Sequence, residues 1–133
     1  MNGLTPSQLQ SYLDDGYLVI DSLFDPAQLD SLTDELDTVI DKWAGAYRAK
    51  GRLQNTYVDE PFERRLRSIQ LAMTEIPELL DEVLGKRKTP AMFQVLTMPE
   101  ILDVVESVIG PEILVHPQFN SRAKLPDGAS IVG

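Results

Sequence analysis

At 133 residues, with 43% hydrophobic and 25% charged residues, the chain has the size and composition of one ordinary globular domain. Its 21 acidic residues outnumber 12 basic ones, and the net charge of −9 argues against a nucleic-acid partner, because binding phosphates needs a basic surface. Without cysteine the chain forms neither a disulfide nor a thiolate metal site. We expect a single domain over residues 1–133.

The N-terminus lacks the basic and apolar regions of a secretory signal peptide. No apolar run in the sequence approaches the length needed to span a membrane. We therefore expect a soluble, cytoplasmic protein with no membrane partner.

The first predicted elements are a helix and a strand. Thr5-Pro6-Ser7-Gln8 is typical of a helix start, with Thr5 as the cap and Gln8 completing a capping box, and Gly16 predicts the end of this helix. The β-prone run Tyr17-Leu18-Val19-Ile20 then predicts a short buried strand.

Asp25-Pro26-Ala27-Gln28 repeats the start signal and predicts a long helix up to Gly51. Apolar residues at helical spacing form one face of it. The other face is acidic and is interpreted as solvated surface; it carries Asp30, Asp34, Glu35, Asp37 and Asp41.

After a loop over residues 52–60, four further helices are predicted, over residues 61–75, 77–85, 90–96 and 99–110. Prolines at their starts and glycines at the ends of two of them support these boundaries. In the first of the four, Glu63, Arg64, Arg65 and Arg67 predict a mixed-charge exterior.

The segment 113–125 predicts a second strand, because polar and apolar or small side chains alternate along it. One face would hold the polar side chains, which are His116, Gln118, Asn120, Arg122 and Lys124. Such a row of amide and cationic donors suits binding of a dicarboxylate. It is equally typical of the outer face of an exposed strand, and the pattern does not separate the two.

The common catalytic motifs are absent from the sequence, and no catalytic residue is predicted. His116 is the only histidine, so one copy of the chain cannot supply a site with two imidazoles. The acidic pairs Asp14-Asp15 and Asp59-Glu60 are interpreted as caps or surface charges.

Several segments carry a resemblance to a known family. Near the N-terminus they are Leu4-Thr5-Pro6-Ser7-Gln8-Leu9, Asp15-Gly16-Tyr17-Leu18-Val19-Ile20 and Leu23-Phe24-Asp25-Pro26. Later, Ile109-Gly110-Pro111 leads into His116-Pro117-Gln118-Phe119-Asn120 and Lys124-Leu125-Pro126. In order and spacing, over essentially the whole chain, they resemble the N-terminal portion of the phytanoyl-CoA dioxygenase family of iron(II)- and 2-oxoglutarate-dependent oxygenases.

The resemblance implies an α+β, mainly helical fold: the N-terminal helical half plus the first strands of a double-stranded β-helix, a cupin- or jelly-roll-like barrel that is incomplete here. The full-length oxidoreductase would use iron(II) and 2-oxoglutarate to hydroxylate a small organic or acyl substrate. Its His-x-Asp and distant second His would follow Gly133, so no metal ligand is carried over. We expect this fragment to bind no cofactor and to be inactive alone.

The resemblance also implies a set of cofactor-binding residues. Asn120 resembles a residue that lines the co-substrate pocket, and His116, Gln118 and Arg122 share its predicted face. Lys124 is a weaker candidate on the same face.

A different class of function fits the same sequence: a non-catalytic, acidic helical interaction module derived from such an enzyme. In either case a contiguous exposed apolar surface would be unusual for a stable monomer. Such a surface would mark where the remainder of the enzyme docks, or would allow self-association.

Overall fold

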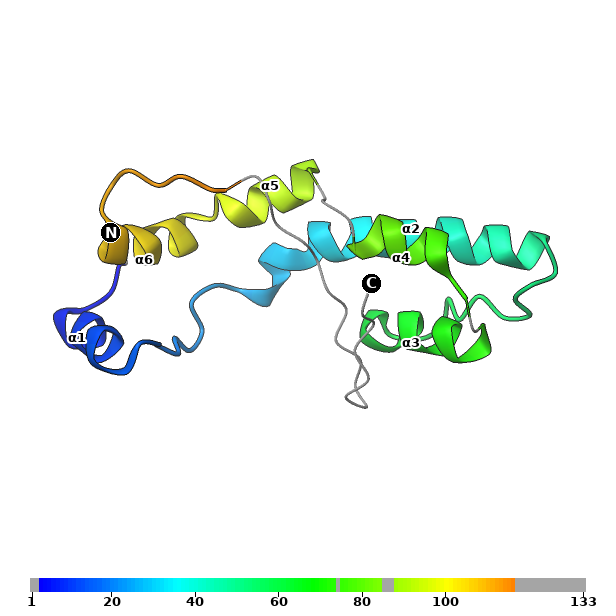
Figure 1. The fold of residues 1–133 in the computed structure, drawn as a ribbon, viewed down its shortest axis with the longest axis horizontal. Coiled ribbons are helices and arrows are strands. Elements are labelled where there is room, and N and C mark those ends of the chain that lie inside the picture. The colour runs from blue at the N-terminus through cyan, green and yellow to red at the C-terminus, as the bar shows by residue number, and fades with distance from the viewer. Residues whose placement is uncertain (1–2, 74, 85–87, 117–133) are drawn as a thin grey trace. The chain divides into compact units, whose positions relative to one another are not determined.

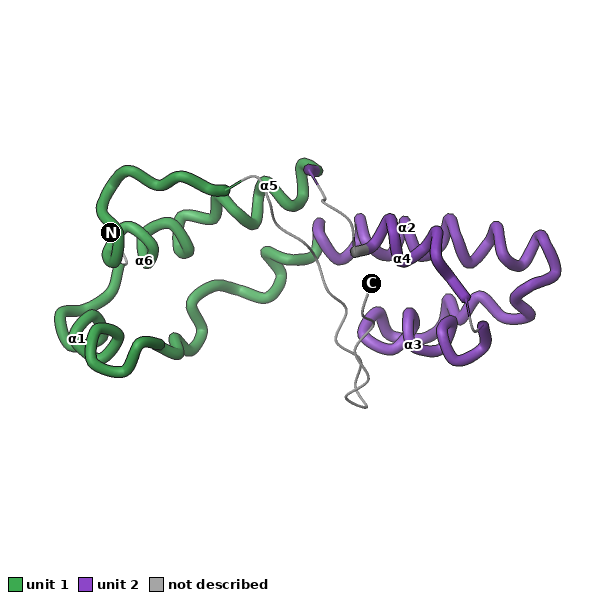
Figure 2. The backbone as a smooth tube through the Cα atoms, in the orientation of Figure 1, with its two compact units in different colours: residues 1–30, 89–117 green, residues 31–88, 118–133 purple. Residues whose placement is uncertain are grey.

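The structure is a computed structural model that describes residues 3–73, 75–84 and 88–116. Its described residues form six α-helices and one short 3₁₀-helix (Figure 1). The chain divides into two compact units, shown in Figure 2: unit 1 is residues 1–30 with 89–117, and unit 2 is residues 31–88 with 118–133.

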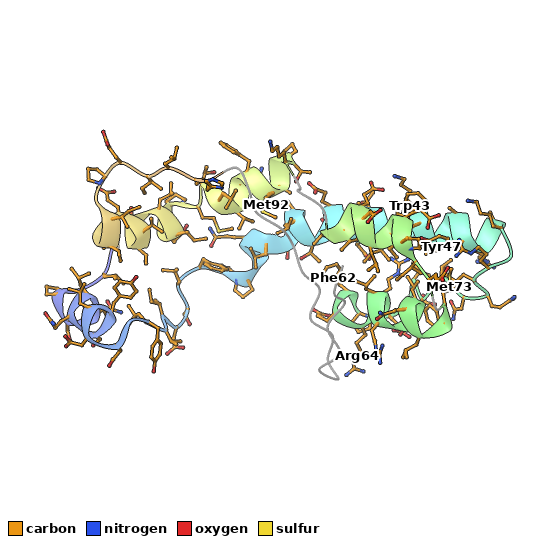
Figure 3. The ribbon with its side chains drawn as sticks, viewed as in Figure 1. Trp43, Tyr47, Phe62, Arg64, Met73 and Met92 are labelled. Carbon is orange, nitrogen blue, oxygen red and sulfur yellow. The ribbon has the colours of Figure 1, made fainter. Side chains whose placement is uncertain are left out.

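Unit 2 is built from α2 (Asp30–Ala49), α3 (Phe62–Ala72) and α4 (Pro77–Leu84). Their apolar faces meet in one buried cluster, to which the loop residue Leu53 also belongs. The side chains of Ala44, Tyr47, Ile69 and Leu79 have no exposed surface. In Figure 3, Tyr47 and Met73 lie in the interior among these helices, whereas Arg64 points outward from α3.

Unit 1 contains α1 (Pro6–Asp15), the 3₁₀-helix η1 (Pro26–Leu29), α5 (Pro90–Leu96) and α6 (Pro99–Ile109). The predicted start of α1 is confirmed: Thr5 accepts a hydrogen bond from the Gln8 N–H, and Gln8 closes the capping box. The predicted end is confirmed too, since Gly16 adopts the left-handed conformation at φ 78°.

Few of the described side chains of unit 1 are buried. Among its described residues, Ala91 and Met98 are the only buried hydrophobic side chains, and neither α1 nor α6 has a buried residue. Large apolar side chains remain at the surface instead; they include Leu13, Tyr17, Val19, Phe93, Ile109 and Leu114.

The predicted α+β fold is wrong for the described part of the chain, which is all α-helical. Residues 17–20 are irregular, as are residues 112–116, so the expected first strands of a β-helix are not formed there. The physical reason is that a β-prone run needs a neighbouring strand to satisfy its backbone groups, and propensity alone does not supply one. The rest of the predicted strand 113–125 lies outside the described residues.

The helix predictions hold better, with small differences at the ends. The second start signal produces a single 3₁₀ turn before α2 begins at Asp30, and α3 ends at Ala72 because Met73 is already extended. The expectation of a single domain over residues 1–133 stays a prediction. Among the described helices, none is long and apolar enough to cross a bilayer.

Candidate functional site

One concave feature of unit 1 is a pocket of about 290 Å³, which we call the apolar pocket. Its volume lies near the lower end of the range for small-molecule sites. The only polar side-chain group in its lining is the hydroxyl of Tyr12. The pocket is lined by Leu4, Tyr12, Leu18, Ile20, Val104, Val105, Val108 and Ile109.

The apolar pocket brings the two ends of unit 1 together. The Leu4 N–H donates a 2.9 Å hydrogen bond to Ser107 Oγ, across 103 positions of sequence. Ser107 Oγ in turn donates to the Asp103 carbonyl at 2.8 Å within α6. A Cβ at position 3 would collide with Ser107 Oγ, so glycine is needed there for the close approach.

The extended segment after α1 supplies the opposite wall. Side chains alternate along it: Leu18 and Ile20 line the pocket and are partly buried, while Tyr17 and Val19 are 69% and 74% exposed. Gly16 makes this possible because its left-handed conformation turns the chain out of α1. Apolar groups therefore occupy both sides of this segment.

A second pocket in unit 1, which we call the acidic pocket, has a volume of about 210 Å³. It is lined by Gly3, Asp103, Glu106 and Ser107, so it shares α6 with the apolar pocket. The two pockets place apolar surface and carboxylates on the same helix.

Charge is distributed unequally between the two units. Unit 1 contains nine acidic residues and no lysine or arginine, whereas unit 2 contains twelve acidic and twelve basic residues. The net charge of −9 is therefore the charge of unit 1.

The residues predicted to bind the co-substrate fall at the edge of the described chain. His116 is exposed and lies in an irregular segment of unit 1. Gln118, Asn120, Arg122 and Lys124 lie outside the described residues, so their predicted common face stays a prediction. Within the described ranges, no group of three or more His, Asp or Glu side chains is placed to hold a metal ion.

The charged cluster around Arg65 in unit 2 is structural. Arg65 is 2% exposed; it donates to Asp37 Oδ1 at 2.8 Å, to Asp41 Oδ1 at 2.5 Å and to the Thr56 carbonyl at 3.3 Å. Burial would lower the pKa of Arg65, but the hydrogen bonds and charges of Asp41 and Asp37 outweigh it and the pKa is raised. The predicted placement of Arg65 on a solvated exterior is therefore wrong.

A second polar cluster of unit 2 joins α2 to α4. The Tyr47 hydroxyl donates to Glu78 Oε2 at 2.9 Å and accepts from the Leu79 N–H at 3.2 Å, so it caps the first turn of α4. Burial and then the bond to Glu78 raise the pKa of Tyr47. The pKa of Glu78 is lowered by a bond to its own backbone N–H and by the Tyr47 hydroxyl.

Residues about one helical turn away on α2 and α4 extend this junction. Glu82 Oε2 accepts from Trp43 Nε1 at 2.6 Å and from Lys42 Nζ at 2.7 Å. The Lys42 ammonium also lies 4.8 Å from the centre of the Trp43 ring. These contacts fix α4 on α2.

Sequence reasoning missed the apolar pocket as a site. The available signal was α6, where Val104, Val105, Val108 and Ile109 make a wide apolar face on a helix of eleven residues. Such a face predicts an ordinary position in a hydrophobic core, and the periodicity of the sequence does not identify the element that packs on it. The pocket can hold an apolar group, and Tyr12 is its only titratable side chain.

Comparison with known proteins gave no relative for this chain. It matches no protein-family model, no curated protein and no solved structure.

Proposed function

We propose that this chain is the N-terminal portion of an iron(II)- and 2-oxoglutarate-dependent oxygenase of the phytanoyl-CoA dioxygenase type. In the complete protein, the reaction is hydroxylation of a small organic or acyl substrate. The proposal rests on the family-like segments of the sequence, and these segments contribute no metal ligand.

The observation that carries the proposal is the convergence of these segments in unit 1. Leu4, Leu18 and Ile20 come from the N-terminal segments, and Ile109 begins the later one. All four residues line the apolar pocket.

In this proposal the segment that holds His116, Gln118, Asn120 and Arg122 contributes to the 2-oxoglutarate pocket. Amide and guanidinium donors suit the two carboxylates of that co-substrate. Because His116 is the only histidine among the 133 residues, the iron ligands would come from a His-x-Asp and a second His elsewhere in the protein.

The first test is the transcript that encodes this chain. We expect its reading frame to continue beyond the codon for Gly133 into a His-x-Asp motif. A stop codon at that point would contradict the proposal.

The second test is catalytic. With iron(II), 2-oxoglutarate and ascorbate, we expect the complete protein to release succinate and the 133-residue chain to release none. In the complete protein, Asn120→Ala should raise KM for 2-oxoglutarate about tenfold, as expected for loss of a polar contact to a charged ligand. Leu71→Ala, on the exposed side of α3, is the matched control and should leave KM unchanged.

The buried cluster of unit 2 favours a second function for the chain as a whole, a non-catalytic, acidic helical interaction module derived from such an enzyme. The three helices of unit 2 close a buried cluster of their own, and the described residues of this unit contain no β-strand. Such a module should unfold cooperatively. A broad thermal transition with strong binding of an apolar dye before unfolding would contradict it.

A further inference from the structure

The segments that form the apolar pocket also carry apolar side chains that the described chain leaves in contact with solvent. Leu13 is 65% exposed, Tyr17 69%, Val19 74% and Ile109 60%. These residues either line the pocket or adjoin its lining in sequence. Concentrated apolar exposure of this kind marks an interaction surface.

Charge identifies what can cover this surface. Unit 1 carries nine carboxylates and no lysine or arginine. A second copy of unit 1 would bring two such sets together without a lysine or arginine from either, and juxtaposed like charges oppose association. An anionic membrane or a nucleic acid is disfavoured for the same reason.

The arrangement of apolar and acidic side chains on α6 indicates which kind of partner could bind this surface. Val104, Val105, Val108 and Ile109 line the apolar pocket, while Asp103 and Glu106 line the adjoining acidic pocket. Gly3 and Leu4, neighbours in sequence, also contribute one residue to each pocket. An apolar side chain in the first pocket therefore places its own neighbours close to the carboxylates of the second.

We propose that this face of unit 1 docks a polypeptide segment that carries an apolar anchor flanked by lysine or arginine. The anchor occupies the apolar pocket, and the flanking cations face Asp103 and Glu106. This docking goes beyond the oxygenase function and does not depend on it, because it rests on the surface and charge of unit 1 alone.

The test uses the full 133-residue chain and three labelled synthetic peptides, followed by fluorescence anisotropy. One is an amphipathic peptide of leucine and lysine, the second replaces each lysine with glutamate, and the third replaces each leucine with serine. We expect saturable one-to-one binding of the leucine and lysine peptide, weakened by added salt. The other two peptides should bind at least about tenfold more weakly.

Variants of the chain localise the binding. Val105→Asp places a charge in the apolar pocket and should weaken binding of the leucine and lysine peptide about tenfold or more. Glu106→Gln keeps the shape of an exposed side chain but removes its charge. This variant should bind the leucine and lysine peptide about threefold more weakly than the parent chain, and added salt should weaken its binding less. The matched controls Leu71→Asp and Glu63→Gln lie on α3 of unit 2 and should bind as the parent chain does.

Four results would overturn the proposal. Equal binding of the lysine and glutamate peptides would show that charge does not select the occupant. Unchanged affinity of the Glu106→Gln variant, if its circular dichroism spectrum stays helical, would place binding elsewhere. A loss of affinity in Leu71→Asp as large as that in Val105→Asp would do the same. A dimer in sedimentation velocity that Val105→Asp abolishes would assign the surface to a second copy.

Discussion

All eleven residues of the buried cluster belong to unit 2, whereas unit 1 buries only Ala91 and Met98 among its described hydrophobic residues. Both units are helical, and in each the helices have one apolar side. In unit 2 those sides face one another across α2, α3 and α4. In unit 1 they line an open pocket.

The difference shows that an amphipathic pattern identifies the apolar face of a helix but does not identify what packs against that face. Apolar faces of the same kind are satisfied within one unit and left at the surface in the other. The unequal charge follows the same division, since unit 2 balances its acidic residues with basic ones and unit 1 does not. One chain thus contains a unit with a buried apolar cluster and a unit whose described apolar faces remain largely at the surface.

The largest expected effect comes from the cluster of unit 2. Leu79→Ala removes a side chain with no exposed surface and should lower the free energy of unfolding by about 2–5 kcal/mol. Leu13→Ala in α1, where the leucine is 65% exposed, should change it by about 0.5 kcal/mol or less. Urea unfolding followed by circular dichroism measures both. A comparable loss in Leu13→Ala would break the contrast between the units.

The next effect concerns the charged cluster. Arg65→Ala should cost about 2–4 kcal/mol, because the buried guanidinium holds two carboxylates and the Thr56 carbonyl and its stem packs in the interior. Arg64→Ala, one position earlier and exposed, should cost about 0.5 kcal/mol or less. Arg65→Lys should recover only part of the loss, since an ammonium cannot reach all three acceptors. If Arg65→Lys were as stable as the parent chain, the positive charge alone, and not the geometry of the guanidinium, would account for the contribution of Arg65.

The smallest expected effect concerns the cap of α4. Tyr47→Phe removes the acceptor of the Leu79 N–H and should cost about 1–2 kcal/mol in urea unfolding. Tyr12→Phe, in the open pocket of unit 1, should change the free energy by about 0.5 kcal/mol or less. Equal losses in the two variants would remove the distinction between the buried Tyr47 hydroxyl and the hydroxyl of the pocket-lining Tyr12.

The pH dependence of stability sharpens this last comparison. Because the pKa of Tyr47 is raised in the folded state, its contribution is complete below the ordinary value of 10.0 and is lost as pH rises through the folded pKa. The pKa of Glu78 is lowered, so its contribution is present above the ordinary value of 4.5 and is lost as pH falls through the folded pKa. Tyr47→Phe should therefore lose less stability above pH 10 than the parent chain does.

Much of the helical structure was predictable because its signals are local. The capping box of Thr5 and Gln8 forms as expected, and prolines begin α1, α4, α5 and α6. Each signal involves groups within one turn, so it depends mainly on residues near in sequence. The one surprise is the start signal at Asp25, which closes a 3₁₀ turn before α2 begins.

The strand prediction for residues 17–20 failed because a strand depends on a distant partner, whereas the predicted site residues Gln118, Asn120 and Arg122 lie outside the described residues. The run Tyr17-Leu18-Val19-Ile20 has high strand propensity, yet no ladder forms there among the described residues. Arg65 is buried because Asp37 and Asp41 meet it from another helix, and helical spacing alone places it with Arg64 and Arg67 outside. The apolar pocket needs residues from both ends of the sequence.

The bond from the Leu79 N–H to the Tyr47 hydroxyl has a consequence for the order of folding. It joins residues 32 positions apart, and α4 has only eight residues, fewer than a helix needs to be stable alone in water. Contact with the twenty-residue α2 therefore contributes to the stability of α4. We expect the docking of α4 to be a late step, reached after the folding transition state has organised α2.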